Sequence, residues 1–220
     1  MNTYALIARF YEHIIDDVLS QLVLDKILEH TKPCKSLEIG CGTAYISRVL
    51  ARKNYDVAAM DNTLEMLEIA SNYAAYDHIE MTFLHHDMHA PFDYQADLII
   101  MATDVINHAQ SASHMKTIID HVYNQLNPLG IFIVDVLNCE YLNSLVGHQE
   151  TISLEEATIQ WHVEKGDSPC SVVHHITMQE VVASHKQISV SLEDFNAMIA
   201  SFELIDFLCL KERTIYVLKK

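Results

Sequence analysis

The sequence predicts an α/β fold built on an open, mostly parallel sheet, and two observations lead to this prediction. First, short apolar stretches alternate along the chain with stretches of helical periodicity, as they do in βαβ units. Second, four successive apolar stretches end in glycine-rich or polar turns, which is typical of strands at the ligand-binding edge of such a sheet. These stretches are residues 37–39, 57–60, 81–84 and 97–101.

The first of these turns contains two glycines. Residues 36–45 read SLEIGCGTAY, so an apolar strand leads into Gly40 and Gly42, and a helical pattern begins at Thr43. This order suits a nucleotide-like ligand that approaches a helix N-terminus, because a Cβ would obstruct either the turn or the ligand. A side chain at Gly40 should then disturb the ligand and the turn rather than the core. Glycines also occur in many βα turns for packing alone, so the turn by itself leaves both interpretations open.

Acidic residues follow the next three strands. Asp61 ends the second strand, about 20 residues after the glycines, where a βαβ unit places a carboxylate that accepts hydrogen bonds from ribose hydroxyls. Asp61 could also cap the following helix, a task that Thr63 could share. Asp87 follows the third strand and Asp104 the fourth. The carboxyl ends of these strands are therefore expected to line one crevice.

These motifs resemble the class I S-adenosylmethionine-dependent methyltransferases. The resemblance rests on LEIGCGTA (37–44), MDNTLEMLEIA (60–70), HDM (86–88), DLIIMATDVINH (97–108) and LNPLGIFIVDV (126–136). It implies a Rossmann-like, doubly wound sheet of seven strands in the order 3-2-1-4-5-7-6, with strand 7 antiparallel. Two positions depart from the family pattern, because Ala44 replaces a frequent third glycine and the turn before the fifth strand is Pro128-Leu129-Gly130.

The resemblance also implies an enzyme whose cofactor is S-adenosylmethionine and whose product is S-adenosylhomocysteine. Gly40 and Gly42 would pass under the methionine part of the cofactor and Asp61 would hold the ribose. Asp87 would bind the adenine amino group, with Met88 against the ring. The expected cofactor-binding residues, with the methyl group near the last two, are Tyr11, Glu38, Gly40, Cys41, Gly42, Asp61, Asn62, Met66, Asp87, Met88, Thr103 and Asp104.

Candidate residues for catalysis and for the methyl acceptor lie farther along the chain. His108 follows Asp104-Val105-Ile106-Asn107, and a neutral imidazole there could accept a proton from an acceptor N–H or O–H. Alternatively, His108 caps or packs the following helix. Asn107 and Trp161 are the expected acceptor-binding residues.

Residues 151–189 interrupt the alternation of strands and helices. Polar and apolar side chains alternate over 158–164, residues 171–182 are rich in β-branched side chains, and the segment between them has turn chemistry. We expect a small antiparallel sheet, which the resemblance makes an inserted lid that selects a small-molecule acceptor. Trp161 should share the apolar face, and His162 should lie on the opposite face.

The two ends of the chain are expected to complete a single domain, residues 1–220. Residues 1–31 have helical periodicity with a break near Asp16, and the resemblance makes them a cap over the cofactor mouth that brings Tyr11 to the ligand. A helix is expected over 191–201. Strands over 203–210 and 213–219, separated by two residues, should form an antiparallel hairpin.

Composition excludes several other classes of function. The formal net charge of −16 and the absence of a basic stripe exclude a nucleic-acid partner, since nucleic-acid affinity depends on Lys and Arg. No apolar run of 18 residues indicates a membrane span. Five scattered cysteines suit reduced thiols and a cytoplasmic protein. No metal site is expected, because adjacent His174 and His175 on a strand would point to opposite faces.

The leading interpretation is methyl transfer from S-adenosylmethionine to a small-molecule N or O nucleophile by in-line displacement. Holding donor and acceptor in line can supply ~7–11 kcal/mol of the barrier. Two alternatives remain open. A nicotinamide-dependent oxidoreductase would need a further glycine where Tyr45 stands. A non-catalytic S-adenosylmethionine-binding module would keep the pocket without the reaction. Neither the acceptor nor the oligomeric state follows from the sequence.

Overall fold

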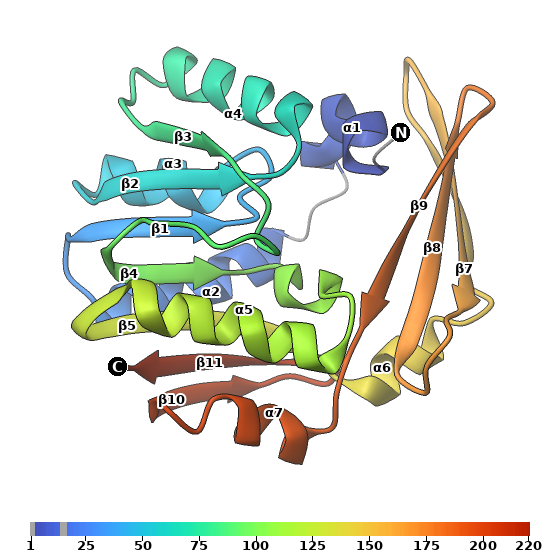
Figure 1. Cartoon of the computed structure of the whole chain (residues 1–220). Helices are drawn as coiled ribbons and strands as arrows, with labels where there is room; N and C mark the ends of the chain where they lie inside the picture. The colour runs from blue at the N-terminus through green and yellow to red at the C-terminus, as the bar shows by residue number, and fades with distance from the viewer. Residues whose placement is uncertain (1–2, 14–16) are drawn as a thin grey trace.

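The computed structural model describes residues 3–13 and 17–220, and it contains two separate sheets (Figure 1). The break expected near Asp16 lies outside the described residues. The first sheet has seven strands in the order β10 (Glu203–Cys209), β11 (Arg213–Lys219), β5 (Leu126–Leu137), β4 (Ala96–Met101), β1 (Lys35–Ile39), β2 (Asp56–Asp61) and β3 (Thr82–His85). β11 runs antiparallel to both of its neighbours, and the strands from β5 to β3 are parallel. The predicted order and the predicted C-terminal hairpin are confirmed.

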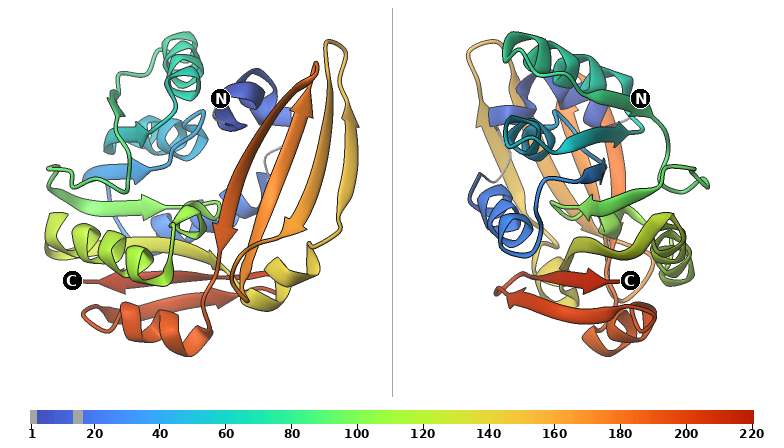
Figure 2. Two further views of the ribbon diagram at one scale, coloured as in Figure 1. Left: turned by 45° about the vertical axis from the view of Figure 1, so that its right-hand side comes forward. Right: turned by 90° about the vertical axis from the view of Figure 1, so that its left-hand side faces the viewer.

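Helices cover both faces of this sheet (Figures 1 and 2). One face packs against α2 (Asp17–His30), α3 (Tyr45–Arg52) and α4 (Leu64–Tyr76), and the other against α5 (Ala112–Gln125) and α7 (Leu192–Met198). The central strand β4 contributes side chains to the core on both faces of the sheet, because successive side chains of a strand point to opposite sides. Leu98 and Ile100 join the core under α2, whereas Ile99 and Met101 join the core under α5.

The second sheet is the predicted insertion. It has four antiparallel strands in the order β6 (Gln149–Ser153), β7 (Thr158–Lys165), β8 (Ser171–Met178) and β9 (Val181–Ile188), and α6 (Cys139–Ser144) leads into it. The sheet stands across the carboxyl ends of the parallel strands (Figure 1). The helix α1 (Thr3–Ile7) and the 3-10 helix η1 (Ala8–His13) lie between the two sheets.

The two faces of the inserted sheet differ as the alternation predicts. Ile159 and Val163 on β7 are buried and pack with Trp161, which confirms their shared apolar face. The side chain of His162, on the opposite face, is 38% exposed and lies 3.4 Å from Glu164. The inner face of this sheet therefore lies toward the edge where β1, β2 and β4 end.

One expectation about the cysteines is wrong. Cys139 and Cys170 form a disulfide, with their Cα atoms 5.0 Å apart, while Cys34, Cys41 and Cys209 are free. The two cysteines are 31 residues apart in sequence. The fold brings them together because the first residue of α6 lies beside the start of β8. The scattered spacing therefore gave no sign of the bond.

Candidate active site

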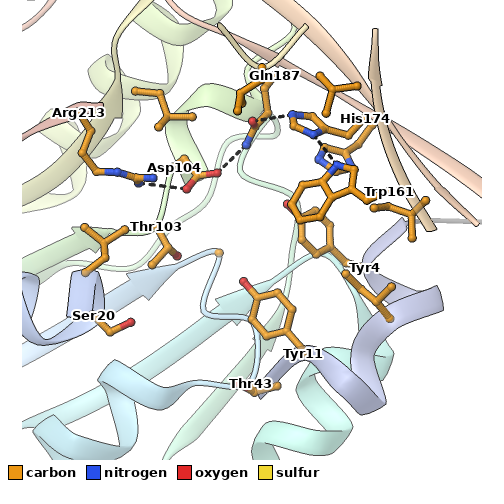
Figure 3. Close-up of a pocket in the computed structure, with 18 of the residues that line it drawn as sticks. Tyr4, Tyr11, Ser20, Thr43, Thr103, Asp104, Trp161, His174, Gln187 and Arg213 are labelled. Carbon is orange, nitrogen blue, oxygen red and sulfur yellow. Dashed lines mark hydrogen bonds and ion pairs between the residues drawn. The ribbon is translucent and has the colours of Figure 1, made fainter. Parts of the chain in front are cut away.

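Two cavities lie between the carboxyl edge of the seven-stranded sheet and the inserted sheet. The sheet-side cavity, about 540 Å³, extends over the turns that follow β1, β2 and β4. The insertion-side cavity, about 420 Å³, lies beneath β7, β8 and β9 (Figure 3). The residues that line both cavities form the wall between them: Tyr4, Tyr11, Gly40, Thr103 and His185.

The glycine turn after β1 lies at this wall. Gly40 and Gly42 both have left-handed backbone conformations, with φ of +69° and +53°. A Cβ at Gly42 would lie 3.1 Å from the Tyr11 ring, beside the sheet-side cavity. A Cβ at Gly40 would lie 2.5 Å from a methyl group of Val105, which belongs to the core. The expectation that a side chain at Gly40 would spare the core is therefore wrong.

Asp61 fastens this turn to the end of β2. Its Oδ2 accepts a hydrogen bond from the backbone N–H of Gly42 at 2.9 Å, and its Oδ1 accepts one from the N–H of Thr63 at 2.9 Å. The Thr63 side chain makes no cap hydrogen bond to α4, and the Asp61 carboxylate holds the backbone N–H of this N-cap residue. Burial raises the pKa of Asp61, and the two N–H donors oppose that shift. The carboxylate also lines the sheet-side cavity together with Asn62.

Each predicted cofactor-binding residue except Asp87 lines at least one of the two cavities. The predicted residues of the sheet-side cavity are Tyr11, Gly40, Gly42, Asp61, Asn62, Met66, Met88 and Thr103. Those of the insertion-side cavity are Tyr11, Glu38, Gly40, Cys41, Thr103 and Asp104. Asp87 lines neither cavity, because its Oδ1 accepts hydrogen bonds from the backbone N–H of His89 and bonds the ring Nδ1 of that residue. His89, which sequence reasoning did not select, lines the sheet-side cavity in its place.

His108 and Asn107 lie in the 3-10 helix η2 (Val105–His108) but have different surroundings. His108 lines the sheet-side cavity, and its Nε2 lies 2.9 Å from the Tyr4 hydroxyl. Burial lowers the pKa of His108, so the ring is neutral at pH 7. The N-cap of α5 is Ser111, which excludes the alternative that His108 caps this helix.

Asn107 does not face either cavity, contrary to its expected role in acceptor binding. It is fully buried, its Nδ2 donates to the carbonyl of Ile188 at 2.7 Å, and its Oδ1 accepts from the N–H of Leu137 at 3.0 Å. Ser189 adds a hydrogen bond from its Oγ to the carbonyl of Leu137 at 2.5 Å. Asn107 therefore holds together the end of β5 in the seven-stranded sheet and the end of β9 in the inserted sheet.

The turn after β4 is strained and is held by buried charges. Thr103 and Asp104 have consecutive left-handed conformations, with φ of 56° and 58°, and such strain in non-glycine residues clusters at functional sites. Arg213 Nη1 lies 3.1 Å from Asp104 Oδ1 and 2.7 Å from Asp135 Oδ2. Asp135 also accepts a hydrogen bond from the backbone N–H of Asp104 at 3.1 Å. Burial raises the pKa of Asp135 to about 6, against the effect of Arg213.

A chain of hydrogen bonds continues from Asp104 into the inserted sheet (Figure 3). Gln187 donates to Asp104 Oδ2 at 2.5 Å, and its Oε1 lies 3.0 Å from His174 Nε2. The indole N–H of Trp161 donates to His174 Nδ1 at 3.0 Å, so the proton of the neutral ring is on Nε2. Burial lowers the pKa of His174 to about 4. Neither ring nitrogen of His174 remains available to a ligand.

Glu38 is a buried carboxylate on β1 whose protonation should affect stability. Ser47 donates to its Oε2 through both the backbone N–H and the hydroxyl, but burial has the larger effect and raises the pKa of Glu38 to about 7. The folded protein therefore binds a proton that the unfolded chain has released, and this contribution to stability is lost as the pH rises toward 7 and above.

We expect Glu38→Gln to abolish this pH dependence. From pH 5.5 to pH 8, the free energy of unfolding of the wild type should fall by about 2 kcal/mol relative to that of the variant, as measured by urea denaturation. The buried histidines titrate in both proteins, so their contributions cancel in the difference. A constant difference between the two proteins over this range would contradict the raised pKa.

The described residues include one group with the geometry of metal ligands, and it lies away from both cavities. Glu29, His30 and Asp206 place their ligand atoms within 4.8 Å of one another on α2 and β10. Lys26 Nζ already lies 2.5 Å from Asp206 Oδ2, so an ammonium ion neutralises this carboxylate. The group is an ion-pair cluster on the surface.

The fold and the position of the cavities define a class of protein: a Rossmann-like α/β domain that binds a nucleotide-like cofactor where its parallel strands end. Residues 37–130 match the family model described as a methyltransferase domain. YqeM of Bacillus subtilis, a provisional methyltransferase by its name, is 25% identical over 88% of this chain and 85% of its own length. The ubiquinone biosynthesis O-methyltransferase of Rickettsia canadensis is 24% identical over 57% of this chain and 53% of its own length.

The structural comparison extends the likeness over the whole fold. The crystal structure of an S-adenosylmethionine-dependent methyltransferase from Clostridium acetobutylicum superposes with a TM-score of 0.82 at 20% identity, over 97% of this chain and 96% of that one. These similarities support an S-adenosylmethionine-dependent methyltransferase of class I, with S-adenosylmethionine as its cofactor. No helix among the described residues is long and apolar enough to cross a membrane.

Proposed function

We propose that this enzyme methylates the nitrogen of a small-molecule amine, with the adenosine of the cofactor in the sheet-side cavity and the acceptor in the insertion-side cavity. The observation that carries this proposal is the wall of five residues that both cavities share. A methyl donor and its acceptor must meet across such a wall, in line and shielded from water.

The residues of the sheet-side cavity fit S-adenosylmethionine. Asp61 offers a carboxylate and Asn62 an amide to the ribose hydroxyls, while Met66 and Met88 offer apolar surface to the adenine ring. Gly42 leaves room for the cofactor, because a Cβ there would already touch Tyr11. When bound, S-adenosylmethionine supplies an electrophilic methyl group, whose bond to sulfur breaks as the bond to the acceptor forms.

The charges of the insertion-side cavity favour nitrogen over oxygen as the acceptor atom. Asp104 and Glu150 line this cavity, and Arg213, which also lines it, shares its Nη1 between Asp104 and Asp135. A phenolate or a carboxylate would meet further negative charge, whereas the ammonium product of amine methylation would be stabilised. Burial lowers the pKa of His174 and of His185, two of the histidines that line this cavity, so neither adds positive charge.

The walls of the insertion-side cavity suit a flat apolar body beside the amine. Trp161 and Tyr141 contribute aromatic rings, and Ile159, Val163 and Ile176 contribute aliphatic side chains. Aromatic faces also attract a cationic methylammonium group. We therefore assign acceptor selection to the inserted sheet, as part of the single domain.

A methyl-transfer assay with three matched acceptors tests the proposed function. Benzylamine, p-cresol and phenylacetate have similar rings but present an amine, a phenol and a carboxylate. Transfer of labelled methyl from S-adenosylmethionine should be fastest to benzylamine. Faster transfer to p-cresol would overturn the choice of nitrogen, and no transfer to any of the three would count against a small aromatic acceptor.

Trp161→Ala should impair use of the acceptor but not of the cofactor. The indole lines the insertion-side cavity alone and is absent from the sheet-side cavity. We expect kcat/KM for benzylamine to fall roughly 10-fold, with an unchanged Kd for S-adenosylmethionine. Equal losses in both quantities in a folded variant would instead assign Trp161 to the cofactor.

A further inference from the structure

His185 occupies the centre of a cluster of rings at the wall between the two cavities. It lies on β9 of the inserted sheet and lines both cavities. Its ring stacks on that of His174, with centroids 4.7 Å apart and an interplanar angle of 8°. The centroids of His108 and Tyr4 lie 5.2 Å and 5.3 Å from it. Any acceptor atom that reaches the methyl group must pass close to this ring.

His185 differs from the other two histidines of the cluster because its Nδ1 lacks a hydrogen bond to any residue that the structure describes. His174 uses both ring nitrogens, for Trp161 and Gln187, and His108 bonds Tyr4. Within the described part of the chain, Nδ1 of His185 is buried and has no hydrogen-bond partner. Most buried polar atoms have a partner, and leaving one without costs free energy. Because no hydrogen bond within the described residues holds the His185 ring, the ring can turn so that a nitrogen faces the cavity, where a ligand that donates a hydrogen bond would reduce that cost.

We propose that His185 accepts a hydrogen bond from the N–H of the acceptor amine and so turns the lone pair of the nitrogen toward the methyl group. This inference rests on the proposed amine methylation and adds the residue that orients the nucleophile. Hydrogen-bond acceptance uses the ring in its neutral state, because only a neutral imidazole has a nitrogen lone pair.

The surroundings of His185 keep it neutral throughout the reaction. Burial lowers the pKa of His185 to about 2, and the neighbouring His108 and His174 act in the same direction. The ring therefore does not remove the proton as a base. The amine reacts as its neutral free base, since only that form has a lone pair. The N–C bond forms from this lone pair, the electron pair of the breaking C–S bond goes to sulfur, and the positive charge moves from sulfur to nitrogen. The proton stays on that nitrogen and leaves with the product.

The hydrogen bond should strengthen during this charge transfer. As the nitrogen becomes positive, its N–H becomes a better donor to His185, so the interaction is stronger in the transition state than in the ground state. Its loss should therefore appear mainly in kcat. A residue that served only to pack the wall would not produce this separation between kcat and KM.

His185→Phe tests the proposal because it keeps a flat ring and removes both nitrogens. With benzylamine as the acceptor, kcat should fall roughly 10-fold, as expected for one hydrogen bond, while the Kd for S-adenosylmethionine stays unchanged. His185→Gln, which restores an acceptor oxygen, should keep more activity than His185→Phe. The matched control is His175→Phe, on the outer face of the same sheet, where the histidine bonds Ser184. An equal kcat in His185→Phe and wild type would overturn the proposal and leave the proposed function standing.

Nitrogen NMR of the histidine rings gives a second readout that does not require turnover. In wild-type protein loaded with S-adenosylhomocysteine, benzylamine should shift the His185 ring nitrogens, whereas toluene, which has no donor, should not. If this shift appears but benzylamine is not methylated, the contact is supported and amine methylation is the part that fails. If the ring nitrogens do not respond to benzylamine, the proposed contact is wrong.

Discussion

Replacing Asp61 by alanine is expected to weaken S-adenosylmethionine binding by about 100-fold or more. The carboxylate would accept two charge-assisted hydrogen bonds from the ribose, each contributing about 1.5–3 kcal/mol. It also braces the glycine turn beside the sheet-side cavity, through the backbone N–H groups of Gly42 and Thr63. Both effects act in the same direction, and isothermal titration calorimetry measures their sum.

Two further variants separate these contributions. Asp56→Ala, at the opposite and exposed end of β2, is the matched control and should bind the cofactor normally. Asp61→Asn keeps the size of the side chain but loses the charge and one acceptor, so its affinity should be intermediate. A folded Asp61→Ala protein with wild-type affinity would show that the ribose lies elsewhere.

The second large effect is expected at Arg213. Replacing it by methionine leaves the buried carboxylate of Asp135 and the partly exposed one of Asp104 without their cation, and breaking a buried pair typically costs about 3–5 kcal/mol. For a chain of this size the melting temperature should fall by roughly 10 °C or more. Calorimetry and urea denaturation without cofactor measure the loss.

The mechanism of this destabilisation can be checked by a second substitution. Asp135→Asn in the Arg213→Met protein removes a buried charge that has lost its partner, so it should restore part of the lost stability. Arg52→Met is the control, because its ion pair with Asp77 lies at the surface and such pairs contribute about 1 kcal/mol or less. If Arg213→Met were no more destabilising than Arg52→Met, the buried cluster would not be a source of stability.

The sequence was sufficient to predict what depends on local pattern. The strand order, the inserted antiparallel sheet and the C-terminal hairpin follow from apolar periodicity, turn residues and the family resemblance. The position of Asp61 beside the same cavity as Gly40 and Gly42 could be predicted because a single βαβ unit fixes the distance between them. Trp161 was found because alternation along a strand decides which face a side chain joins.

The remainder of the site depends on contacts between distant segments. Gln187 and His185 approach Asp104 and Tyr4 only after the inserted sheet folds over the edge of the main sheet. Asp135 left one local signal, since it is a charged residue in the middle of an apolar strand, but its partner Arg213 is 78 residues away. Asn107 was expected to bind the acceptor, but the 3-10 turn that it shares with His108 sends these neighbours in different directions.

The two hydrogen bonds of the Asn107 side chain have a consequence for how this enzyme could diversify. Because one amide joins the N–H of Leu137 to the carbonyl of Ile188, the last residue of β5 and the last residue of β9 are held together at the base of the inserted segment. Insertions, deletions or wholesale exchange between these two residues would therefore leave the order and spacing of the strands of the main sheet unchanged. Evolution, or a protein engineer, could therefore replace the acceptor-selecting segment as a cassette, provided that Asn107 and its two backbone partners were kept.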